Sequence, residues 1–201
     1  MSRFGRRTIC VLLVVAMMLG IMPMSALAAS VSDQMKFKVY YKDSVQVYQT
    51  NSFQSAWTEV AKYGGTLEMF ADAKLTYAHN VSADIEVTIQ TNGHTIDRGL
   101  AKSASPKADG EMFHVKKNAT LTVIGGTLTG AYNSDGGGAI DLLDNATLIL
   151  QGVTITDNRT TDHRGGGAIR MHGDNSHVRM DADTVISNNH ALLSQVEQDY
   201  Y

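Results

Sequence analysis

Cysteine and proline are nearly absent from this chain. Cys10 is the only cysteine and lies in an N-terminal segment that we expect to be removed, so the mature chain would hold no thiol. It would then fold without disulfides, which is ordinary for bacterial exported proteins and unusual for small animal secreted domains. The two prolines stand against 18 glycines, which indicates many tight turns in a regular scaffold rather than disorder.

Residues 1–28 have the pattern of a secretory signal peptide. Three arginines precede the apolar run Ile9–Ile21, and the small-residue triplet Ala26-Leu27-Ala28 closes the segment. This pattern predicts cleavage after Ala28. A membrane anchor is the alternative, but the uncharged run is shorter than the roughly 20 residues that a spanning helix needs. We therefore expect a bacterial protein that is secreted or held at the cell surface, with no membrane span after signal cleavage.

Excess positive charge is also absent. Removing the signal removes three of the 17 basic residues and none of the 20 acidic ones, which leaves 14 − 20 = −6 with histidine neutral. The sequence shows no basic stripe with interleaved aromatic residues, and an acidic protein repels a polyanion. We therefore exclude nucleic acid as a partner and expect the mature chain to form one domain.

Residues 29–65 predict two short strands followed by one helix. Lys36–Tyr41 and Val45–Gln49 are rich in β-branched and aromatic residues, which indicates a small hairpin or two edge strands. The next apolar residues recur at helical spacing and predict about three helical turns with the only tryptophan in the core: Phe53, Ala56, Trp57, Val60 and Ala61. Asn51 and Gln54 are placed as a capping box, and Gly64-Gly65 would end the helix.

Residues 66–190 carry an internal repeat. Asn118-Ala119-Thr120-Leu121 returns as Asn145-Ala146-Thr147-Leu148, a period of 27. Gly136-Gly137-Gly138-Ala139-Ile140 returns as Gly165-Gly166-Gly167-Ala168-Ile169, a period of 29. Each repeat contains short segments rich in Thr, Val, Ile and Leu, which predict strands and leave no room for a crossover helix. If each strand pairs with its equivalent one repeat later, the repeats are the coils of a parallel β-helix.

Stacking explains which residues recur. Alternate residues would point inward and form continuous apolar ladders: Leu121 and Val123 with Leu148 and Leu150, then Val178 and Met180, and in a second ladder Leu128, Ile155 and Ile186. Asn158 and Asn188 follow strands and suit the left-handed conformation that turns a corner. The glycine triplets allow close backbone approach at a turn. The glycosylation-like sequences at Asn118, Asn145 and Asn158 recur at one place in the repeat, so we interpret them first as structural.

These residues resemble the right-handed parallel β-helix superfamily, which includes pectate-lyase-like enzymes and bacterial surface adhesins. The resemblance rests on Gly-Gly-Ala-Ile, Asn-x-Thr-Leu-x-Leu and Ile-x-x-Asn elements, and on the entry segments Ala56–Val60, Gly64–Leu67 and Asn92–Ile96. It implies an all-β right-handed parallel β-helix (solenoid) over residues 66–190, with an N-terminal capping α-helix. Residues 191–201 would form a short tail at an open end, which either folds over the last coil as a short amphipathic turn or marks a C-terminally truncated chain.

The resemblance implies where chemistry would lie but supplies no catalytic motif. Members that cleave polysaccharides use carboxylates on an outer sheet face, as an acid/base pair or as Ca²⁺ ligands beside a basic residue. Aspartates recur across the repeats, although solvated outward positions are the simpler interpretation: Asp135, Asp141, Asp144, Asp157, Asp162, Asp181 and Asp183. The register sets Asp141 opposite Arg170 and predicts a surface pair.

The histidines point no more clearly than the aspartates to a catalytic or metal site. His163, His172 and His177 could serve as a base or as metal ligands, and His94 resembles a recurring corner residue. Because no His-x-x-x-His, Gly-His-Gly or Asp-Asp motif accompanies them, the catalytic residues, if the protein is an enzyme, stay unknown, and we predict no cofactor-binding residue and no metal site. Neither glycine triplet is followed by Lys-Ser/Thr, so nucleotide binding is rejected.

Regular repeats without a recognised catalytic constellation favour a binding role. We expect a secreted or cell-surface β-helix repeat protein that acts as an adhesion, carbohydrate-binding or surface-binding scaffold, with a polysaccharide or a host or cell-surface glycan as partner. A pectin-degrading type of polysaccharide lyase or glycoside hydrolase is the alternative, and only then would Ca²⁺ be a cofactor; an N-terminal fragment of a longer such protein is another. The open end predicts self-association. The ligand, the enzymatic question, the mode of attachment and the oligomeric state stay open.

Overall fold

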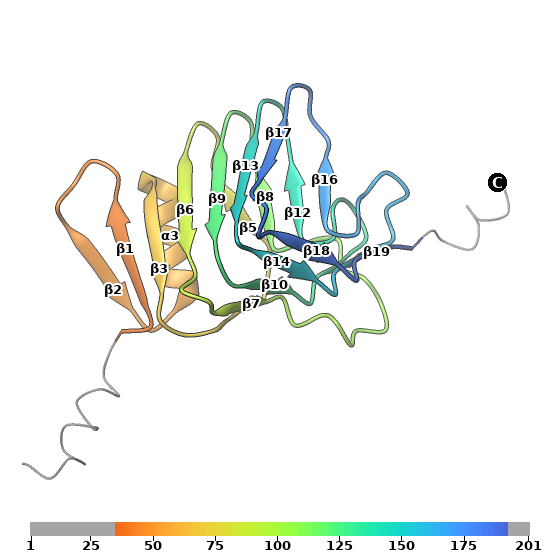
Figure 1. Ribbon diagram of the computed structural model, residues 1–201, viewed down its shortest axis with the longest axis horizontal. Helices are drawn as coiled ribbons and strands as arrows, with labels where there is room; N and C mark the ends of the chain where they lie inside the picture. The colour runs from red at the N-terminus through yellow and green to blue at the C-terminus, as the bar shows by residue number, and fades with distance from the viewer. Residues whose placement is uncertain (1–34, 193–201) are drawn as a thin grey trace, which may run out of the picture. The chain divides into compact units, whose positions relative to one another are not determined.

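Parallel strands dominate residues 35–192, the part of the chain that the computed structural model describes (Figure 1). Within it the chain is mostly β structure with one helix. The signal peptide predicted at residues 1–28 lies outside the described residues, as does most of the tail predicted at residues 191–201. Among residues 35–192, no helix is long and apolar enough to span a membrane.

The predicted hairpin is confirmed at the start of the described chain. β1 (Phe37–Tyr41) pairs antiparallel with β2 (Val47–Thr50). On its other side β1 pairs antiparallel with β3 (Gly65–Met69), so the hairpin continues a larger sheet. Of the two hairpin strands, only β2 is an edge strand. Phe37 and Val39 face the core from β1 because alternate strand residues point to the same side.

The predicted helix is α3, Phe53–Tyr63, but its capping residue differs from the prediction. Ser52 is the N-cap, and its side-chain oxygen accepts a hydrogen bond from the Ser55 N–H at 3.2 Å. Asn51 instead accepts a hydrogen bond from the Lys36 N–H through its side-chain oxygen, at 3.1 Å. Gly64 ends the helix with a positive φ of 72°, as the sequence predicted.

One face of α3 packs into the core. Phe53, Ala56, Trp57 and Val60 are buried, which confirms the structural role predicted for the tryptophan. The Trp57 ring lies 5.1 Å from the Phe113 ring between centroids, and its indole N–H donates to the Asn80 carbonyl at 3.2 Å. The helix is therefore fixed against strands that come later in the chain.

The strands that follow α3 lie in four sheets, and within each sheet these strands are arranged in the order in which they occur along the chain. The seven-stranded sheet has the order β17-β13-β9-β6-β3-β1-β2, with β6 Glu86–Gln90, β9 Thr120–Ile124, β13 Thr147–Gln151 and β17 His177–Met180. The five-stranded sheet contains β4 Ala73–Lys74, β7 Thr95–Asp97, β10 Thr127–Thr129, β14 Thr154–Thr156 and β18 Val185–Ser187. The four-stranded sheet contains β5 His79–Val81, β8 Phe113–Val115, β12 Ile140–Leu142 and β16 Ile169–Met171. The three-stranded sheet contains β11 Tyr132–Asn133, β15 Arg159–Thr160 and β19 His190–Ala191.

Each of these strands pairs in parallel with the equivalent strand one repeat later, in the predicted register. Leu121 lies opposite Leu148, Leu128 opposite Ile155 and Ile140 opposite Ile169. The ribbon shows the same succession, with β6, β9, β13 and β17 side by side (Figure 1). The 27- and 29-residue periods of the sequence are therefore the separations along the chain between residues that pair on neighbouring strands.

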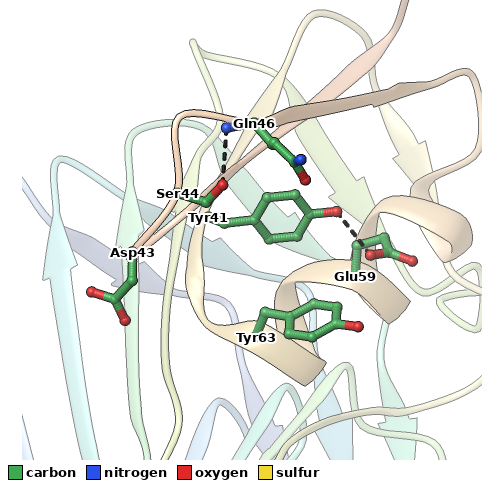
Figure 2. A pocket seen from close by; sticks show the side chains of 6 residues that line it. All are labelled: Tyr41, Asp43, Ser44, Gln46, Glu59 and Tyr63. Atoms are coloured by element: carbon green, nitrogen blue, oxygen red, sulfur yellow. Dashed lines mark hydrogen bonds between the residues drawn. The ribbon is translucent and has the colours of Figure 1, made fainter.

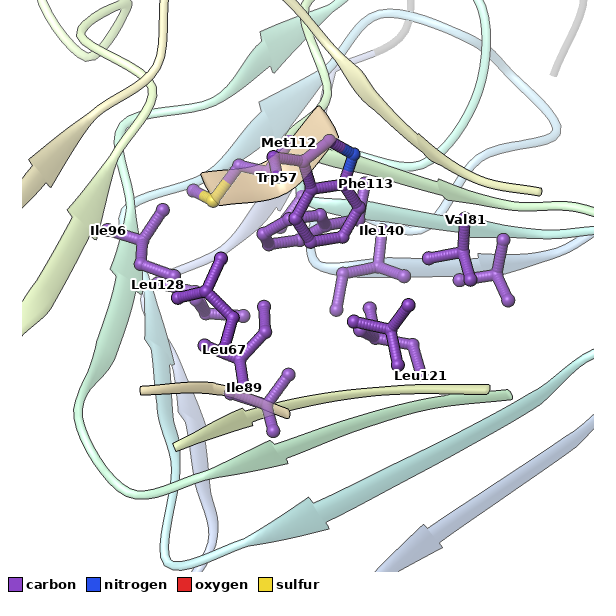
Figure 3. Packing of buried hydrophobic residues seen from close by; sticks show 14 of the residues in the cluster. Trp57, Leu67, Val81, Ile89, Ile96, Met112, Phe113, Leu121, Leu128 and Ile140 are labelled. Atoms are coloured by element: carbon purple, nitrogen blue, oxygen red, sulfur yellow. The ribbon is translucent and has the colours of Figure 1, made fainter. Parts of the chain in front are cut away.

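The core lies between the sheets. Leu121, Leu128 and Ile140 come from three different sheets, are fully buried and point toward a shared interior (Figure 3). The ladders do not stay buried to their end, however. Met180 is 56% exposed and Ile186 is 42% exposed, because their strands β17 and β18 are the last in their sheets within the described residues. The prediction that these two residues are inside is correct in register and wrong in burial.

Asparagines of the Asn-Ala-Thr repeats turn one corner of each repeat. Asn118 and Asn145 have positive φ of 58° and 55°. Their side chains form a hydrogen-bonded ladder: the Asn118 amide donates to Asp84 at 2.8 Å, and the Asn145 amide donates to Asn118 at 3.1 Å. At these two positions the structural interpretation of the glycosylation-like sequences is confirmed.

A second corner corrects the prediction for Asn158. The left-handed residues there are Asp157 and Asn188, with φ of 57° and 54°. Asn158 instead turns its side chain inward, is fully buried and donates to the Leu128 carbonyl at 3.2 Å and to Asn189 Oδ1 at 3.0 Å. The strand register sets Asp157 opposite Asn188 and Asn158 opposite Asn189, and aspartate and asparagine both tolerate the left-handed conformation at the corner.

The glycine triplets permit close backbone approach, as predicted. A Cβ atom on Gly138 would overlap the carbonyl oxygen of Gly167 in the next repeat. The Gly138 N–H donates to the Gly166 carbonyl at 2.9 Å, which fixes the two loops against each other. These loops cover part of the four-stranded sheet.

Candidate functional site

Asp141 and Arg170 lie opposite each other on β12 and β16, in the register predicted from the sequence. They form a buried pair and not the predicted surface pair, since Asp141 is 2% exposed and Arg170 is 7% exposed. Two hydrogen bonds join them, from Nε to Oδ1 at 2.8 Å and from Nη2 to Oδ2 at 3.0 Å. The first glycine loop excludes water here, because Gly136 lies against both side chains.

A second buried carboxylate holds the same guanidinium. Arg170 Nη1 donates to Asp162 Oδ2 at 2.7 Å, and Arg164 Nε donates to Asp162 Oδ1 at 3.1 Å. Burial alone would raise the pKa of Asp162, but its hydrogen bonds to Arg164 and the charges of both arginines lower that pKa below its usual value. Burial likewise opposes the charge of Arg170, yet the hydrogen bonds and charge of Asp141 raise its pKa. Asp162 and Arg170 are therefore both ionised.

Three residues around this arginine escaped the sequence prediction: Glu111, His114 and Arg164. His114 on β8 lies opposite Asp141, with its Nε2 3.5 Å from Asp141 Oδ2. Its Nδ1 is 3.8 Å from Glu111 Oε1. Extending the period backwards by one repeat would have found His114, because Phe113-His114-Val115 aligns with Ile140-Asp141-Leu142. We call Glu111, His114, Asp141, Asp162, Arg164 and Arg170 the Arg170 cluster.

Polar atoms of Glu111 and His114 are buried without a hydrogen-bond partner. These atoms are Glu111 Oε2 and His114 Nε2. Burial raises the pKa of the Glu111 carboxyl, with the Asp141 charge adding to the effect. Burial, reinforced by the charge of Lys116, lowers the pKa of the His114 imidazole. Each group is thereby shifted toward its uncharged form.

Only some of the other predicted residues join this cluster. His163 Nδ1 lies 3.6 Å from Asp162, His172 Nδ1 lies 3.2 Å from Arg170 Nη2, and Asp135 lies 3.5 Å from Arg164. The rest lie elsewhere on the repeats: Asp144, Asp157, Asp181, Asp183, His94 and His177. Of these, Asp144 accepts from the Asp174 N–H and Asp181 from the Gly152 N–H, as corner hydrogen bonds. Residues 35–192 contain no group of three or more His, Cys, Asp or Glu side chains that could hold a metal ion.

The Arg170 cluster joins successive repeats. Its guanidinium connects Asp141 of one repeat with Asp162 of the next, through charge-assisted hydrogen bonds. An arginine so engaged is not free to take a proton from a substrate. The cluster therefore acts as a buried clamp between repeats.

An open pocket lies at the other end of the described chain, between the β1–β2 turn and α3 (Figure 2). It has a volume of about 550 Å³, within the range of small-molecule sites, and we call it the tyrosine pocket. Its lining residues are Tyr41, Asp43, Ser44, Gln46, Glu59 and Tyr63.

The aromatic rings of this pocket are held in place. Tyr41 donates its O–H to Glu59 Oε2 at 2.8 Å (Figure 2). The Tyr41 and Tyr63 rings meet edge to face, with centroids 5.6 Å apart and planes at 88°. Burial and the hydrogen bond to Glu59 raise the pKa of Tyr41 to about 12, so its hydroxyl stays a donor.

Little in the sequence points to this pocket. Glu59 and Tyr63 are four residues apart and so share one face of the predicted helix. Nothing local in the sequence sets Tyr41 beside them, because that contact depends on how the hairpin packs against α3.

No protein-family model, curated protein or solved structure matches the chain. The resemblance to β-helix proteins therefore stays a prediction. The Arg170 cluster and the tyrosine pocket, both within residues 35–192, are the sites whose geometry bears on function.

Proposed function

We propose that residues 66–190 form a right-handed parallel β-helix with α3 as its N-terminal cap. The support is the pairing of each strand with its equivalent one repeat later, in all four sheets. Parallel strands joined by crossovers are almost always right-handed. α3 packs its apolar face against the first repeats, where open strand ends would otherwise meet water.

We propose further that this protein is an exported bacterial scaffold, secreted or held at the cell surface, that binds carbohydrate. The tyrosine pocket carries this proposal. A sugar ring has an apolar C–H face, which suits tyrosine rings, and hydroxyl groups, which suit carboxylate, amide and hydroxyl side chains. Tyr63, which is 53% exposed, supplies the first kind of contact, and Glu59, Gln46 and Ser44 supply the second.

The test is binding of the full chain, purified from a bacterial host, to a panel of neutral, acidic and amino-sugar oligosaccharides by titration calorimetry. We expect Tyr63→Ala to weaken the best ligand roughly tenfold, the loss of one aromatic contact. Tyr40→Ala is the matched control, because Tyr40 is similarly exposed (40%) and does not line the pocket. Failure of the whole panel to bind, or equal losses in both variants, would contradict the proposal.

A polysaccharide lyase or glycoside hydrolase is the second candidate, and one observation favours it. The buried, unpartnered Glu111 oxygen lies beside His114 and Asp141, and a carboxyl whose pKa is raised suits a general acid. Incubating the protein with uronic-acid polymers, with and without Ca²⁺, tests this directly. Cleavage that disappears in Glu111→Gln would replace the binding proposal with an enzymatic one.

We also propose that the molecule self-associates through the last repeat of the described residues, strands β16 to β19. All four strands stand at the end of their sheets, and apolar side chains on this repeat are exposed: Met171, Met180, Val185 and Ile186. Unpaired strand edges with apolar neighbours favour pairing with another chain.

A further inference from the structure

The tyrosine pocket has a negative charge that none of its lining residues balances. Two of its six lining side chains are the carboxylates of Asp43 and Glu59, and the other four are uncharged tyrosine, serine and glutamine side chains. The neighbouring Lys42 is engaged elsewhere, since its Nζ lies 2.7 Å from Glu86. A ligand that brings a positive charge would therefore gain attraction that a neutral sugar does not.

One ring of the pocket already holds an ammonium group. Lys62 Nζ lies 4.7 Å from the centroid of the Tyr63 ring, within the range of a cation–π contact. Lys62 is exposed, and Tyr63 and the Glu59 charge raise the pKa of its ammonium group, so Lys62 occupies the place that a ligand ammonium would take and must be displaced by it. Tyr63 therefore offers a cation site that a ligand ammonium can take over.

Glu59 supplies the matching carboxylate. Tyr41 holds its Oε2 at 2.8 Å, which orients the group and leaves Oε1 for a second donor. Glu59 and Tyr63 lie one turn apart on α3, so a ligand ammonium between them meets a carboxylate and a π face together.

We infer that the tyrosine pocket binds a glycan whose amino-sugar units carry a free ammonium group. This inference rests on the carbohydrate-binding function proposed above and names its ligand class. Uronic acids would meet two carboxylates of like charge in the same pocket and are disfavoured.

The experiment compares three probes on the full chain by titration calorimetry: a β-1,4-linked glucosamine tetramer, its fully N-acetylated counterpart and a galacturonate tetramer. We expect the glucosamine tetramer to bind roughly tenfold or more tightly than the N-acetylated one, with attraction that weakens as salt is added. Equal affinities would overturn the amino-sugar inference and leave carbohydrate binding intact. Absence of binding for all three probes and for the wider panel would overturn both.

Variants of the pocket residues test whether the preference for the glucosamine tetramer arises in the tyrosine pocket. Glu59→Gln should lower affinity for the glucosamine tetramer roughly fivefold or more, and by a larger factor than for the N-acetylated tetramer, because only the charged tetramer loses an attraction between opposite charges. Glu68→Gln is the matched control, because Glu68 accepts a hydrogen bond from Tyr40 in the same way, at 2.9 Å, outside the pocket. Lys62→Ala should tighten glucosamine binding, since it removes the competing ammonium; unchanged or weaker binding would count against the inference. Thermal unfolding of each variant verifies the fold.

Discussion

His79 is a buried histidine that its surroundings keep neutral. The residue is 2% exposed, with Nδ1 2.9 Å from the Tyr77 carbonyl and Nε2 2.9 Å from the side-chain amide of Gln54. Its ring stacks on Tyr77 and meets Trp57 edge to face. Burial lowers its pKa to about 4; the Tyr77 carbonyl opposes this shift and the charge of Arg98 adds to it.

This histidine makes stability depend on pH. Its pKa is about 6.5 in the unfolded chain and about 4 in the folded one, so the unfolded state binds the proton first. The free energy of unfolding that comes from keeping His79 neutral is fully present above pH 6.5 and is lost as the pH falls to about 4. The difference between the two pKa values corresponds to about 3 kcal/mol. Urea unfolding between about pH 7 and about pH 4 should show a steeper loss in wild type than in His79→Gln.

Glu111 works in the opposite direction and does not disturb this comparison. Its raised pKa gives stability that is present at low pH and lost as the pH rises. Because Glu111 is the same in wild type and in the variant, the difference between them reports on His79. Parallel pH profiles would contradict the prediction.

Arg170 should be far more important for stability than an exposed cation. Arg170→Met leaves Asp141 and Asp162 buried without their common partner, a loss that typically costs about 3–5 kcal/mol. Lys42→Met is the control, because it breaks a pair with Glu86 in which both side chains are more than half exposed. Chemical denaturation should show a large loss for the first variant and little change for the second. Equal effects would mean that the Arg170 cluster is not a clamp.

At the scale of elements, periodic features could be predicted from the sequence and long-range contacts could not. The register of β9 on β13 follows from the repeated Asn-Ala-Thr-Leu segment, since slipping by one residue would turn Leu121 and Leu148 outward. The position of α3 follows from its apolar spacing, whereas Ser52 replaces Asn51 as the cap because neighbouring residues of similar chemistry compete for one site.

The candidate sites are formed by contacts between residues that are far apart in the sequence, and these contacts could not be predicted from it. Asp141 and Arg170 could be paired from the repeat period, but their burial depends on how the Gly136 loop folds over them. Tyr41 and Glu59 meet only because a hairpin packs on a helix. These are tertiary effects that no local pattern encodes.

The glycine loops give a prediction at this scale. A side chain on Gly138 would overlap the backbone of Gly167, so Gly138→Ala must push the two loops apart and should cost about 2 kcal/mol or more. Gly93→Asn is the control, because Gly93 has a positive φ of 84° that asparagine tolerates, and a Cβ there would meet no atom within 4 Å. Thermal unfolding should separate the two variants clearly. A stable Gly138→Ala protein would show that the loops can adjust.

At the scale of the whole molecule, the described repeats end in an exposed apolar surface. Val185 is 49% exposed and Met171 is 51% exposed, whereas their partners one repeat earlier, Thr154 and Leu142, are less exposed. Strands at the end of a sheet expose apolar side chains that a further strand would cover.

We therefore expect the average mass of the full chain to rise with concentration in light scattering. Met180→Lys should shift the equilibrium toward the monomer, because the charge is buried when two ends meet. Val47→Lys is the control, since Val47 is 42% exposed on β2, the opposite edge of the same sheet. A monomeric wild type at every concentration would contradict self-association.

The parallel pairing between repeats also determines how the molecule would respond to tension. Thr120 pairs with Thr147 and Thr147 with His177, so ladders of strand hydrogen bonds join each repeat to its neighbours. One contact reaches farther, because Arg159 Nη2 donates to the Leu100 and Ala101 carbonyls two repeats earlier. A pull along the direction of stacking would open these ladders one repeat at a time. Each event would release roughly 30 residues of slack, about 100 Å of chain. A protein built in this way would lengthen in steps under tension, while the repeats farther from the load stay folded.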